Sequence, residues 1–305
     1  MKVAVWGAGS IGSGLVRRLA TLPSVSEIHW INRSPQAMEG QAIDIQHGLA
    51  LMPSCHTIER YKQEGQASKA LEQADALVLT LGASVKQGGS RADLYPENCK
   101  IYLETVCLLV STFPGVVVVI TNPVDLLTRL IYKARPGLRS GCTIGLGTLV
   151  ETLRLRAALS DHLSPRRRPS DLPAFAVGTH DENFVMVAER SVLAPHMPEE
   201  EFKPILKMVK GEVTNAAQRV KESGTPSTLH PIVEGAVHLL DTIATDRRTL
   251  LTVSVLDPDD KDGLCCSVPC VIGRDGVIAR CAQLVRGVDM SLGKEAMRKV
   301  ITAAS

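Results

Sequence analysis

The stretch MKVAVWGAGSIGSG, residues 1–14, decides the fold. Residues 2–6 are mostly apolar and predict a buried strand, and Gly7, Gly9 and Gly12 follow it in the pattern G-x-G-x-x-G. In a strand–turn–helix unit the first glycine permits a tight turn, the second lets the backbone approach a pyrophosphate, and the third lets helix and strand pack closely. The stretch therefore predicts a dinucleotide-binding turn.

The helix after this turn completes the expected phosphate site. Ser10 and Ile11 lie at its start, where unpaired N–H groups and the positive end of the helix dipole attract anions. The motif alone is a weak signal, because a tight structural turn in another open α/β sheet has the same glycines. The pattern of the remaining chain decides between these two interpretations.

The first half of the chain alternates strands and helices. We expect strands at residues 2–6, 27–31, 74–81, 115–121 and 142–145, and helices at 11–21, 36–51, 91–113 and 123–134. Short apolar strands that alternate with amphipathic helices indicate parallel pairing with both sheet faces covered. The pattern predicts an α/β fold whose N-terminal, Rossmann-type parallel-sheet domain spans residues 1–146.

The second half has a different character. We expect helices at residues 151–163, 199–223 and 228–245 and from 291 onward, with strand-like segments at 174–177, 184–187 and within 250–278. This mixture predicts a C-terminal α+β substrate domain over residues 147–305. The basic loop SPRRRPSDLP (164–173) is expected to be a solvated surface turn.

Composition excludes several classes of function. Aromatic residues are only 3% of the 305 residues and the net charge is +2, which argues against base-stacking platforms and polyanionic partners. No apolar run reaches the ~18 residues of a membrane helix, and the early glycine turn is unlike a signal peptide. We expect a cytoplasmic protein that binds neither nucleic acid nor membrane.

The eight cysteines form no CxxC pair, and reduced thiols are the default in the cytosol. Cys265, Cys266 and Cys270 lie close together, but alternating burial in a strand explains them as well as a metal would. A structural zinc site needs four ligands at suitable spacing. We therefore expect no metal.

Four segments carry side chains suited to one reaction. They contain Arg91 at the end of a glycine-rich loop, Asn122 after a buried strand, Glu151 and Arg154 on one helix face, and His180 in a turn. Interconverting a 2-hydroxy acid and a 2-keto acid needs a nicotinamide to carry hydride, a group of near-neutral pKa to exchange a proton, and a bidentate cation for the carboxylate. Histidine and arginine suit the last two tasks, and a carboxylate behind the histidine would fix its tautomer.

This ordered set resembles the lactate/malate dehydrogenase superfamily over nearly the whole chain. The segments that carry the resemblance are GAGSIG (7–12), GQAIDIQHG (40–48), GGSRADL (88–94), TNPVD (121–125), GTLVETLRLR (147–156), GTHDENF (178–184), GTPSTLHP (224–231) and LLTVSV (250–255). The resemblance implies a 2-hydroxy acid dehydrogenase that binds a nicotinamide cofactor and assembles as a homodimer or homotetramer.

The resemblance also implies roles for single residues. The catalytic set comprises the proton-relay histidine, its carboxylate partner and a loop arginine that polarises the substrate carbonyl: His180, Glu151 and Arg91. The residues implied to bind substrate are Arg154, Arg91, Asn122, Val85 and Thr228, of which Arg154 holds the carboxylate. Those implied to bind the cofactor, besides the glycine turn and its helix start, are Asn32, Arg33, Ser34, Gly82 and Asn122.

Two departures from the family's pattern concern the proton relay. Glu151 stands where the family has aspartate, so the charge is kept on an arm one methylene longer, and we expect the relay to survive with a slight backbone shift. Asp181 replaces the glycine that usually follows the histidine. Its carboxylate either favours the charged imidazole or points to solvent.

A third departure concerns the substrate's side chain. Val85, six residues before Arg91, stands where malate-type members have arginine and lactate-type members have glutamine. Valine offers neither charge nor hydrogen bond, and an unpaired buried carboxylate is strongly unfavourable. We therefore expect an apolar or bulky side chain on the 2-keto acid. Lys86 in a shifted loop, or specificity set by His230 or Glu234, is the alternative.

The polar turn within IHWINRSPQ (28–36) bears on the cofactor. A dinucleotide-binding unit usually places an acid about 20 residues after the glycine turn, where it accepts the ribose hydroxyls. Here that place holds Asn32, followed by Arg33 and Ser34. Loss of the acid removes the repulsion of a 2′-phosphate, and Arg33 supplies a cation that can pair with it. We expect NADP, with NAD as the alternative if Arg33 merely caps a surface turn.

Together these features predict an NADP-preferring oxidoreductase that interconverts a 2-keto acid and an L-2-hydroxy acid with an apolar or bulky side chain. A malate dehydrogenase with an unusual specificity loop is the alternative within the same class. A non-catalytic NAD(P)-binding sensor or scaffold is the alternative of another class, and the changes at Glu151 and Asp181 motivate it.

Overall fold

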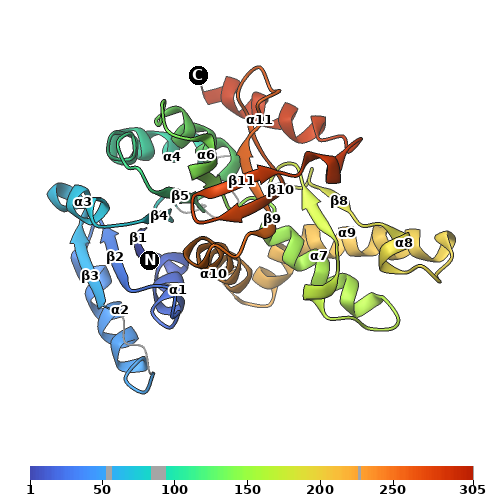
Figure 1. The fold of residues 1–305 in the computed structure, drawn as a ribbon, viewed down its shortest axis with the longest axis horizontal. Coiled ribbons are helices and arrows are strands. Elements are labelled where there is room, and N and C mark those ends of the chain that lie inside the picture. Colours follow the sequence, from blue (N-terminus) through green and yellow to red (C-terminus); the bar gives the residue numbers. More distant parts are fainter. Residues whose placement is uncertain (53–56, 84–93, 226–227, 305) are drawn as a thin grey trace.

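The computed structural model describes residues 1–52, 57–83, 94–225 and 228–304. Within these ranges the strands form a nine-stranded sheet in the order β11-β10-β9-β6-β5-β4-β1-β2-β3, and a separate pair, β7-β8 (Figure 1). The parallel part of the sheet consists of β1 (Lys2–Trp6), β2 (Glu27–Asn32), β3 (Thr57–Lys62), β4 (Ala76–Leu79), β5 (Val116–Val119) and β6 (Thr143–Gly145). The antiparallel part consists of β9 (Thr249–Leu256), β10 (Cys265–Gly273) and β11 (Gly276–Arg280).

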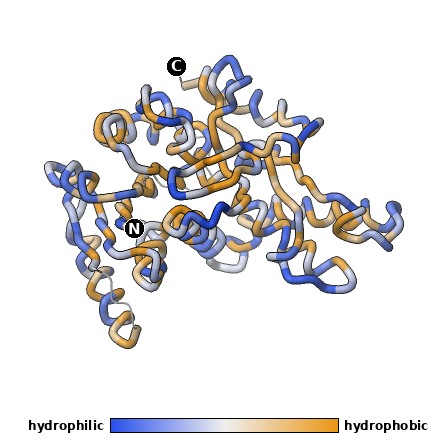
Figure 2. The backbone as a smooth tube through the Cα atoms, in the orientation of Figure 1, coloured by the Kyte–Doolittle hydropathy of each residue, from blue (hydrophilic) through white to orange (hydrophobic). Residues whose placement is uncertain are grey.

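Helices cover both faces of the parallel strands, because these strands are apolar on both sides. One face carries α1 (Ser10–Leu19), α2 (Pro35–Gly48) and α10 (His230–Thr245). The other carries α3 (Gln63–Glu72), α6 (Val124–Lys133), and α4 (Tyr95–Ile101) continued through a π-helical turn (Tyr102–Val106) into α5 (Cys107–Val110). All four residues of β4 and of β5 are buried. Figure 2 accordingly shows hydrophobic residues along the central strands.

A further layer surrounds the hairpin of β7 (Phe175–Val177) and β8 (Val185–Val187). It consists of α7 (Leu149–His162), α8 (Arg190–Leu193) and α9 (Glu199–Glu222), which share one apolar cluster with β7. The last helix, α11 (Ser291–Ala304), packs against α4 and α6 through a small cluster that includes Met297. Short 3₁₀ turns occupy Ser140–Cys142, Pro169–Asp171 and Ala282–Val285. No helix in the described ranges is long and apolar enough to span a membrane.

The predicted fold class is confirmed, and the element list needs corrections. The sequence pattern assigned nothing to residues 52–73, where the structure has β3 and α3. The strands expected at 74–81 and 115–121 are shorter at both ends, and residues 80–81 and 120–121 beyond them line a groove at the edge of the sheet. The helix expected at 91–113 is observed from Tyr95, while residues 91–93 lie outside the described ranges. The boundary at residue 146 stays a prediction.

Candidate active site

The glycine turn between β1 and α1 has the geometry that its sequence predicts. Gly7 has φ of 126°, and a Cβ atom on Gly12 would lie 2.1 Å from the carbonyl oxygen of Gly7. Around Gly9, in contrast, a Cβ atom would meet nothing within 4 Å. The indole N–H of Trp30 donates to the oxygen of Gly7 at 2.9 Å and braces the turn. The turn is therefore tight on the protein side and open where a pyrophosphate would approach.

A groove of about 680 Å³ runs along the carboxyl ends of β1, β2, β4 and β5. Of the residues predicted to bind the cofactor, those that line it are Gly7, Gly9, Ser10, Ile11, Gly12, Asn32, Arg33, Gly82 and Asn122. Ser34 does not line it; this residue precedes α2, and its hydroxyl lies 3.2 Å from Oε1 of Gln36. The open backbone at Gly9 and the first turn of α1, which no described side chain caps, fit a dinucleotide phosphate.

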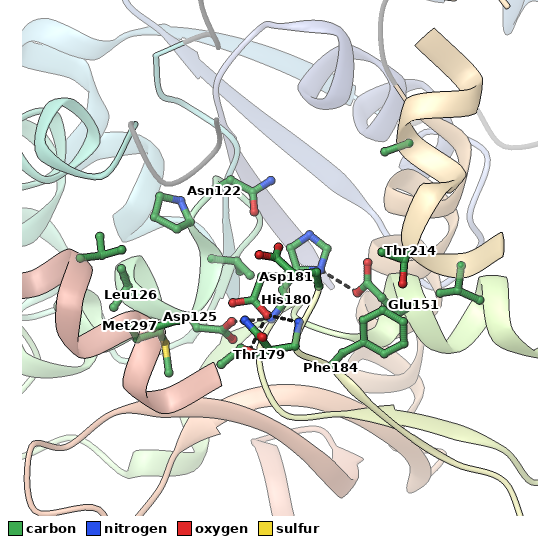
Figure 3. A pocket seen from close by; sticks show the side chains of 18 of the residues that line it. Asn122, Asp125, Leu126, Glu151, Thr179, His180, Asp181, Phe184, Thr214 and Met297 are labelled. Atoms are coloured by element: carbon green, nitrogen blue, oxygen red, sulfur yellow. Dashed lines mark hydrogen bonds and ion pairs between the residues drawn. The ribbon is translucent and has the colours of Figure 1, made fainter. Parts of the chain in front are cut away.

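A second cavity, of about 460 Å³, adjoins the groove at Asn122, which lines both (Figure 3). His180 enters it from the turn after β7, and Glu151 and Arg154 enter it from the first turns of α7. Helices α9 and α11 also line the cavity, and their residues Thr214 and Met297 lie on opposite sides of His180 (Figure 3). The chain thus brings together a histidine, a carboxylate and an arginine from distant segments at one end of the groove.

The histidine and the glutamate form a buried pair. Nδ1 of His180 lies 2.7 Å from Oε2 of Glu151, and the guanidinium of Arg154 lies 3.3 Å from the other carboxylate oxygen. Burial opposes the charge of Glu151, but His180 and Arg154 outweigh it and hold the pKa of this carboxyl below its usual value. The extra methylene of the glutamate is therefore accommodated, and the imidazole is oriented as a proton relay requires.

Asp181 interacts with its own loop. Its Oδ1 accepts a hydrogen bond from the Thr179 hydroxyl at 2.7 Å and from the backbone N–H of Asn183 at 2.8 Å. Nearby, the ammonium of Lys210 lies 3.1 Å from the centroid of the Phe184 ring, and burial lowers its pKa. Asp181 therefore shapes the turn that carries His180 and also lines the cavity.

Several predicted residues lie elsewhere. Arg91, Val85 and Lys86 fall outside the described residues, so their roles stay predictions. Thr228 is buried but lines neither cavity. Glu234, considered as a specificity residue, forms a two-point ion pair with Arg18 of α1, with contacts of 2.7 and 3.0 Å.

The structure adds residues that sequence reasoning did not assign. Asn98, fully buried in α4, donates to the carbonyl of Asn122 and accepts from the N–H of Ala83, both at 2.7 Å. It thereby joins the helix after the Arg91 loop to the residues before that loop. Asp125 contacts the backbone of His180. The quoted segment TNPVD contains Asp125, but nothing in a single sequence shows which buried carboxylate meets the histidine turn.

The described residues contain no group of three or more His, Cys, Asp or Glu side chains that could hold a metal ion. Cys265, Cys266 and Cys270 are buried along β10, and this burial raises the pKa of each thiol. A buried thiol of raised pKa is a poor thiolate ligand.

The fold and the site together define a class: a dinucleotide-binding α/β protein with a buried histidine–carboxylate pair and an arginine beside the groove. The family profile described as "lactate/malate dehydrogenase, NAD binding domain" matches residues 1–140. An L-lactate dehydrogenase from Deinococcus radiodurans is 31% identical over 92% of this chain and 90% of its own length. The chain belongs to the lactate/malate dehydrogenase family, whose members are nicotinamide-dependent 2-hydroxy acid dehydrogenases.

Solved structures agree with this assignment at the level of the fold. The lactate dehydrogenase MGS-M5 from a Medee basin deep-sea metagenome library superposes with a TM-score of 0.85 at 24% identity, over 99% of this chain and 98% of that one. The malate dehydrogenase of Cryptosporidium parvum also reaches a TM-score of 0.85, at 21% identity, with coverage of 99% and 98%. Both lactate and malate enzymes share the fold, so fold alone does not select the substrate.

Proposed function

We propose that the chain reduces a 2-keto acid with one carboxylate and an apolar or bulky side chain to the L-2-hydroxy acid, with NADPH preferred over NADH. The observation that carries the reaction is the 2.7 Å contact between His180 and Glu151 at the end of the dinucleotide groove. This contact argues against a non-catalytic interpretation, because the glutamate that replaces the family's aspartate still reaches the histidine.

The proposed roles follow from the contacts. A bound nicotinamide supplies the hydride for the carbonyl carbon. Arg154 binds the substrate carboxylate in two-point fashion, and His180 gives a proton from Nε2 to the carbonyl oxygen. Glu151 fixes the imidazole through Nδ1 and stabilises its charged form.

The charges of the cavity support a substrate with a single carboxylate. Among the described side chains that line it, Arg154 is the only arginine or lysine, while the acids are Asp125, Glu151, Asp181 and Glu182. The rest of the lining is largely apolar and includes Leu126, Phe184, Val213, Met297 and Val300. A second carboxylate would meet acids or hydrocarbon there, which disfavours the malate alternative.

The turn after β2 supports the cofactor preference. The amide of Asn32 donates to the carbonyl of Ser34 at 3.0 Å, so Asn32 closes the turn. Arg33 is exposed, lines the groove, and has no hydrogen bond or ion pair to the described residues. The lack of a capping contact among these residues supports the proposal that the Arg33 guanidinium pairs with a 2′-phosphate. The matching family profile is described as NAD binding, so the proposed preference for NADPH rests on the turn at Asn32 and Arg33 alone.

The catalytic assignment is tested with a panel of 2-keto acids that includes pyruvate, 2-oxo-4-methylpentanoate, phenylpyruvate and oxaloacetate. We expect kcat/KM to fall by at least 10³-fold in each of two variants. His180→Ala removes the proton donor, and Arg154→Ala removes the group that binds the substrate carboxylate. Wild-type kcat/KM in both variants contradicts the assignment. Oxaloacetate as the best substrate contradicts the proposed side chain and favours the malate alternative.

The cofactor preference is tested by comparing kcat/KM for NADPH and NADH. We expect the wild type to prefer NADPH, and the double variant Asn32→Asp/Arg33→Ile to shift the ratio toward NADH by at least about 100-fold, because it restores the acid and removes the cation. A wild type that prefers NADH would contradict the proposed NADPH preference, but it would not contradict the proposed 2-keto acid reduction.

A further inference from the structure

A buried carboxylate that the reaction scheme above does not use lies directly behind the histidine. Asp125 is in the first turn of α6, three residues after Asn122, and is 5% exposed. Its Oδ2 accepts the backbone N–H of His180 at 2.8 Å, and its Oδ1 accepts the hydroxyl of Ser254 on β9 at 2.5 Å. Figure 3 shows Asp125 beside the His180 turn, below Asn122. One carboxylate therefore joins the Asn122 turn, the His180 turn and the antiparallel part of the sheet.

These hydrogen bonds do not by themselves require a charge. An asparagine could accept the His180 N–H with its oxygen and donate to the Ser254 hydroxyl, which can reverse its direction. The carboxylate is moreover disfavoured where it lies, since burial raises the pKa of Asp125 to about 6 in spite of both hydrogen bonds. A buried charge that stability does not favour is expected where function needs it.

The groups around His180 define what that charge can do. Helix α7 contributes Glu151 and Arg154, the histidine's own loop contributes Asp181, and α9 contributes Lys210. The charge of Asp125 interacts with that of the His180 side chain, and the same carboxylate accepts the backbone N–H of His180. A negative charge at this place favours the imidazolium, which is the form that can give a proton to a keto oxygen.

We propose that Asp125 is a positioning residue of this reaction: it fixes the His180 backbone against the turn that carries Asn122, and its charge extends keto acid reduction to higher pH. Ser254 orients the carboxylate for both tasks. The inference rests on the proposed role of His180 as the proton donor. Asp125 would act through two properties, its hydrogen bonds and its charge, and separate variants can remove them.

Asp125→Ala removes both the hydrogen bonds and the charge, and Asp125→Asn removes only the charge. For reduction of phenylpyruvate by NADPH we expect Asp125→Ala to lower kcat about 100-fold while the KM for NADPH changes less than about threefold. Asp125→Asn should recover most of that loss at the pH optimum, because it keeps the hydrogen bonds. It should also move the high-pH limb of kcat/KM to lower pH by about half to one unit, as expected for a lost neighbouring charge.

Ser254→Ala gives a second test of the Asp125 charge, and this test does not depend on the folding of the Asp125 variants. The Ser254 hydroxyl lowers the pKa of Asp125, so its loss favours the neutral carboxyl. We expect the high-pH limb to move in the same direction as in Asp125→Asn, by a smaller amount.

A matched control is available in α10. Asp241 accepts a hydrogen bond from the hydroxyl of Ser24 at 2.6 Å, in the same way that Asp125 accepts one from Ser254, but it lines neither cavity. We expect Asp241→Asn to change neither kcat nor the pH profile.

The outcomes separate the inference from the function on which it rests. Wild-type rates in His180→Ala overturn both. Two results overturn the role of Asp125 alone, provided that His180→Ala is inactive. The first is a wild-type kcat in Asp125→Ala, and the second is a wild-type high-pH limb in both Asp125→Asn and Ser254→Ala. A limb that moves equally in Asp241→Asn overturns it as well, because the effect would then not come from the site.

Discussion

At the scale of single residues, two buried carboxylates flank the same histidine and differ in their titration. Contacts with His180 and Arg154 outweigh the burial of Glu151 and lower its pKa, whereas burial of Asp125, with no cation in contact among the described residues, raises its pKa to about 6. Environments that push neighbouring pKa values apart are typical of acid–base sites. Glu151, which stands where the family has aspartate, thus keeps the lowered pKa that the proposed proton relay needs.

Two substitutions of Glu151 separate the effect of its side-chain length from the effect of its charge. We expect Glu151→Gln to lower kcat by about 10³-fold or more, because the amide cannot stabilise the imidazolium and allows the wrong tautomer. Glu151→Asp keeps the charge but retracts it by one methylene, so a smaller loss of about tenfold is expected. Steady-state kinetics with saturating keto acid measures both. A larger loss in Glu151→Asp than in Glu151→Gln would show that position, rather than charge, dominates.

The stability of the fold should respond to pH through the same pair. Glu151, with a lowered folded pKa, stabilises the fold above its unfolded value of about 4.5, and this contribution is lost as the pH falls through the folded pKa. Asp125 acts oppositely. Its pKa rises from 3.8 to about 6 on folding, so stability falls as the pH rises between these values, by about 3 kcal/mol in total.

Asp125→Asn should therefore stabilise the protein at pH 8 by up to about 3 kcal/mol, and the gain should shrink toward zero as the pH approaches 4. Urea unfolding of wild type and variant at a series of pH values measures this difference. A variant less stable than the wild type at pH 8 would show that the lost hydrogen-bond geometry outweighs the relieved burial of charge.

At the scale of elements, the sequence predicts those parts of the fold whose burial is regular. The strands β4 and β5 read as continuous apolar runs because both of their faces are covered. The edge strand β3, TIERYK, was missed because it buries only Ile58 and Tyr61, three apart, so its pattern does not alternate. Helix α3 was missed because Glu64 and Gly65 are not helical, which leaves a short helix of weak pattern.

The residues of the candidate site also fall into those that the sequence predicts and those that it does not. Residues tied to a motif, such as the glycine turn and the Glu151–Arg154 pair, could be placed from sequence because local spacing fixes their geometry. Asp125 and Asn98 act through backbone groups of segments far away in the chain, at His180, Ala83 and Asn122. Such contacts depend on tertiary packing, to which a single sequence gives no access.

The glycine turn offers a test that separates folding from binding. A Cβ atom at Gly12 would overlap the oxygen of Gly7, whereas one at Gly9 would meet no protein atom within 4 Å. We expect Gly12→Ala to destabilise the fold by about 2 kcal/mol or more, since α1 must shift away. Gly9→Ala should leave Tm within about 2 °C of the wild type and yet raise the Kd for NADPH at least tenfold. Unchanged NADPH affinity in Gly9→Ala would place the pyrophosphate elsewhere.

At the scale of the whole molecule, one apolar cluster runs through both halves of the chain. It contains Val3 and Trp30 from the first half together with Leu149, Leu239 and Val253 from the second. The two cavities are likewise adjacent, because Asn122 lines both. Its carbonyl is held by Asn98, and its turn is joined to the histidine by Asp125. Cofactor groove and substrate cavity are thus expected to respond to each other.

The assembly that the family resemblance implies belongs to this scale. We expect light scattering after gel filtration to give two or four times the chain mass of 32.8 kDa. A mass of one chain at micromolar concentration would contradict the expected homodimer or homotetramer, and would leave the proposed reaction unaffected.

The link through Asn122 should appear as coupled binding. If Asn122 contacts both ligands, the Kd of oxamate, an unreactive analogue of a 2-keto acid, should be at least tenfold lower with saturating NADPH than without it. In Asn122→Ala we expect this ratio to fall toward one, while Thr214→Ala, in the α9 lining of the cavity, should weaken oxamate without changing the ratio. Calorimetric titration of oxamate into the three proteins, each with and without NADPH, measures this ratio in six experiments. Because coupling is reciprocal, NADPH affinity measured with and without oxamate must change by the same factor, and a ratio preserved in Asn122→Ala would show that the two sites communicate by another route.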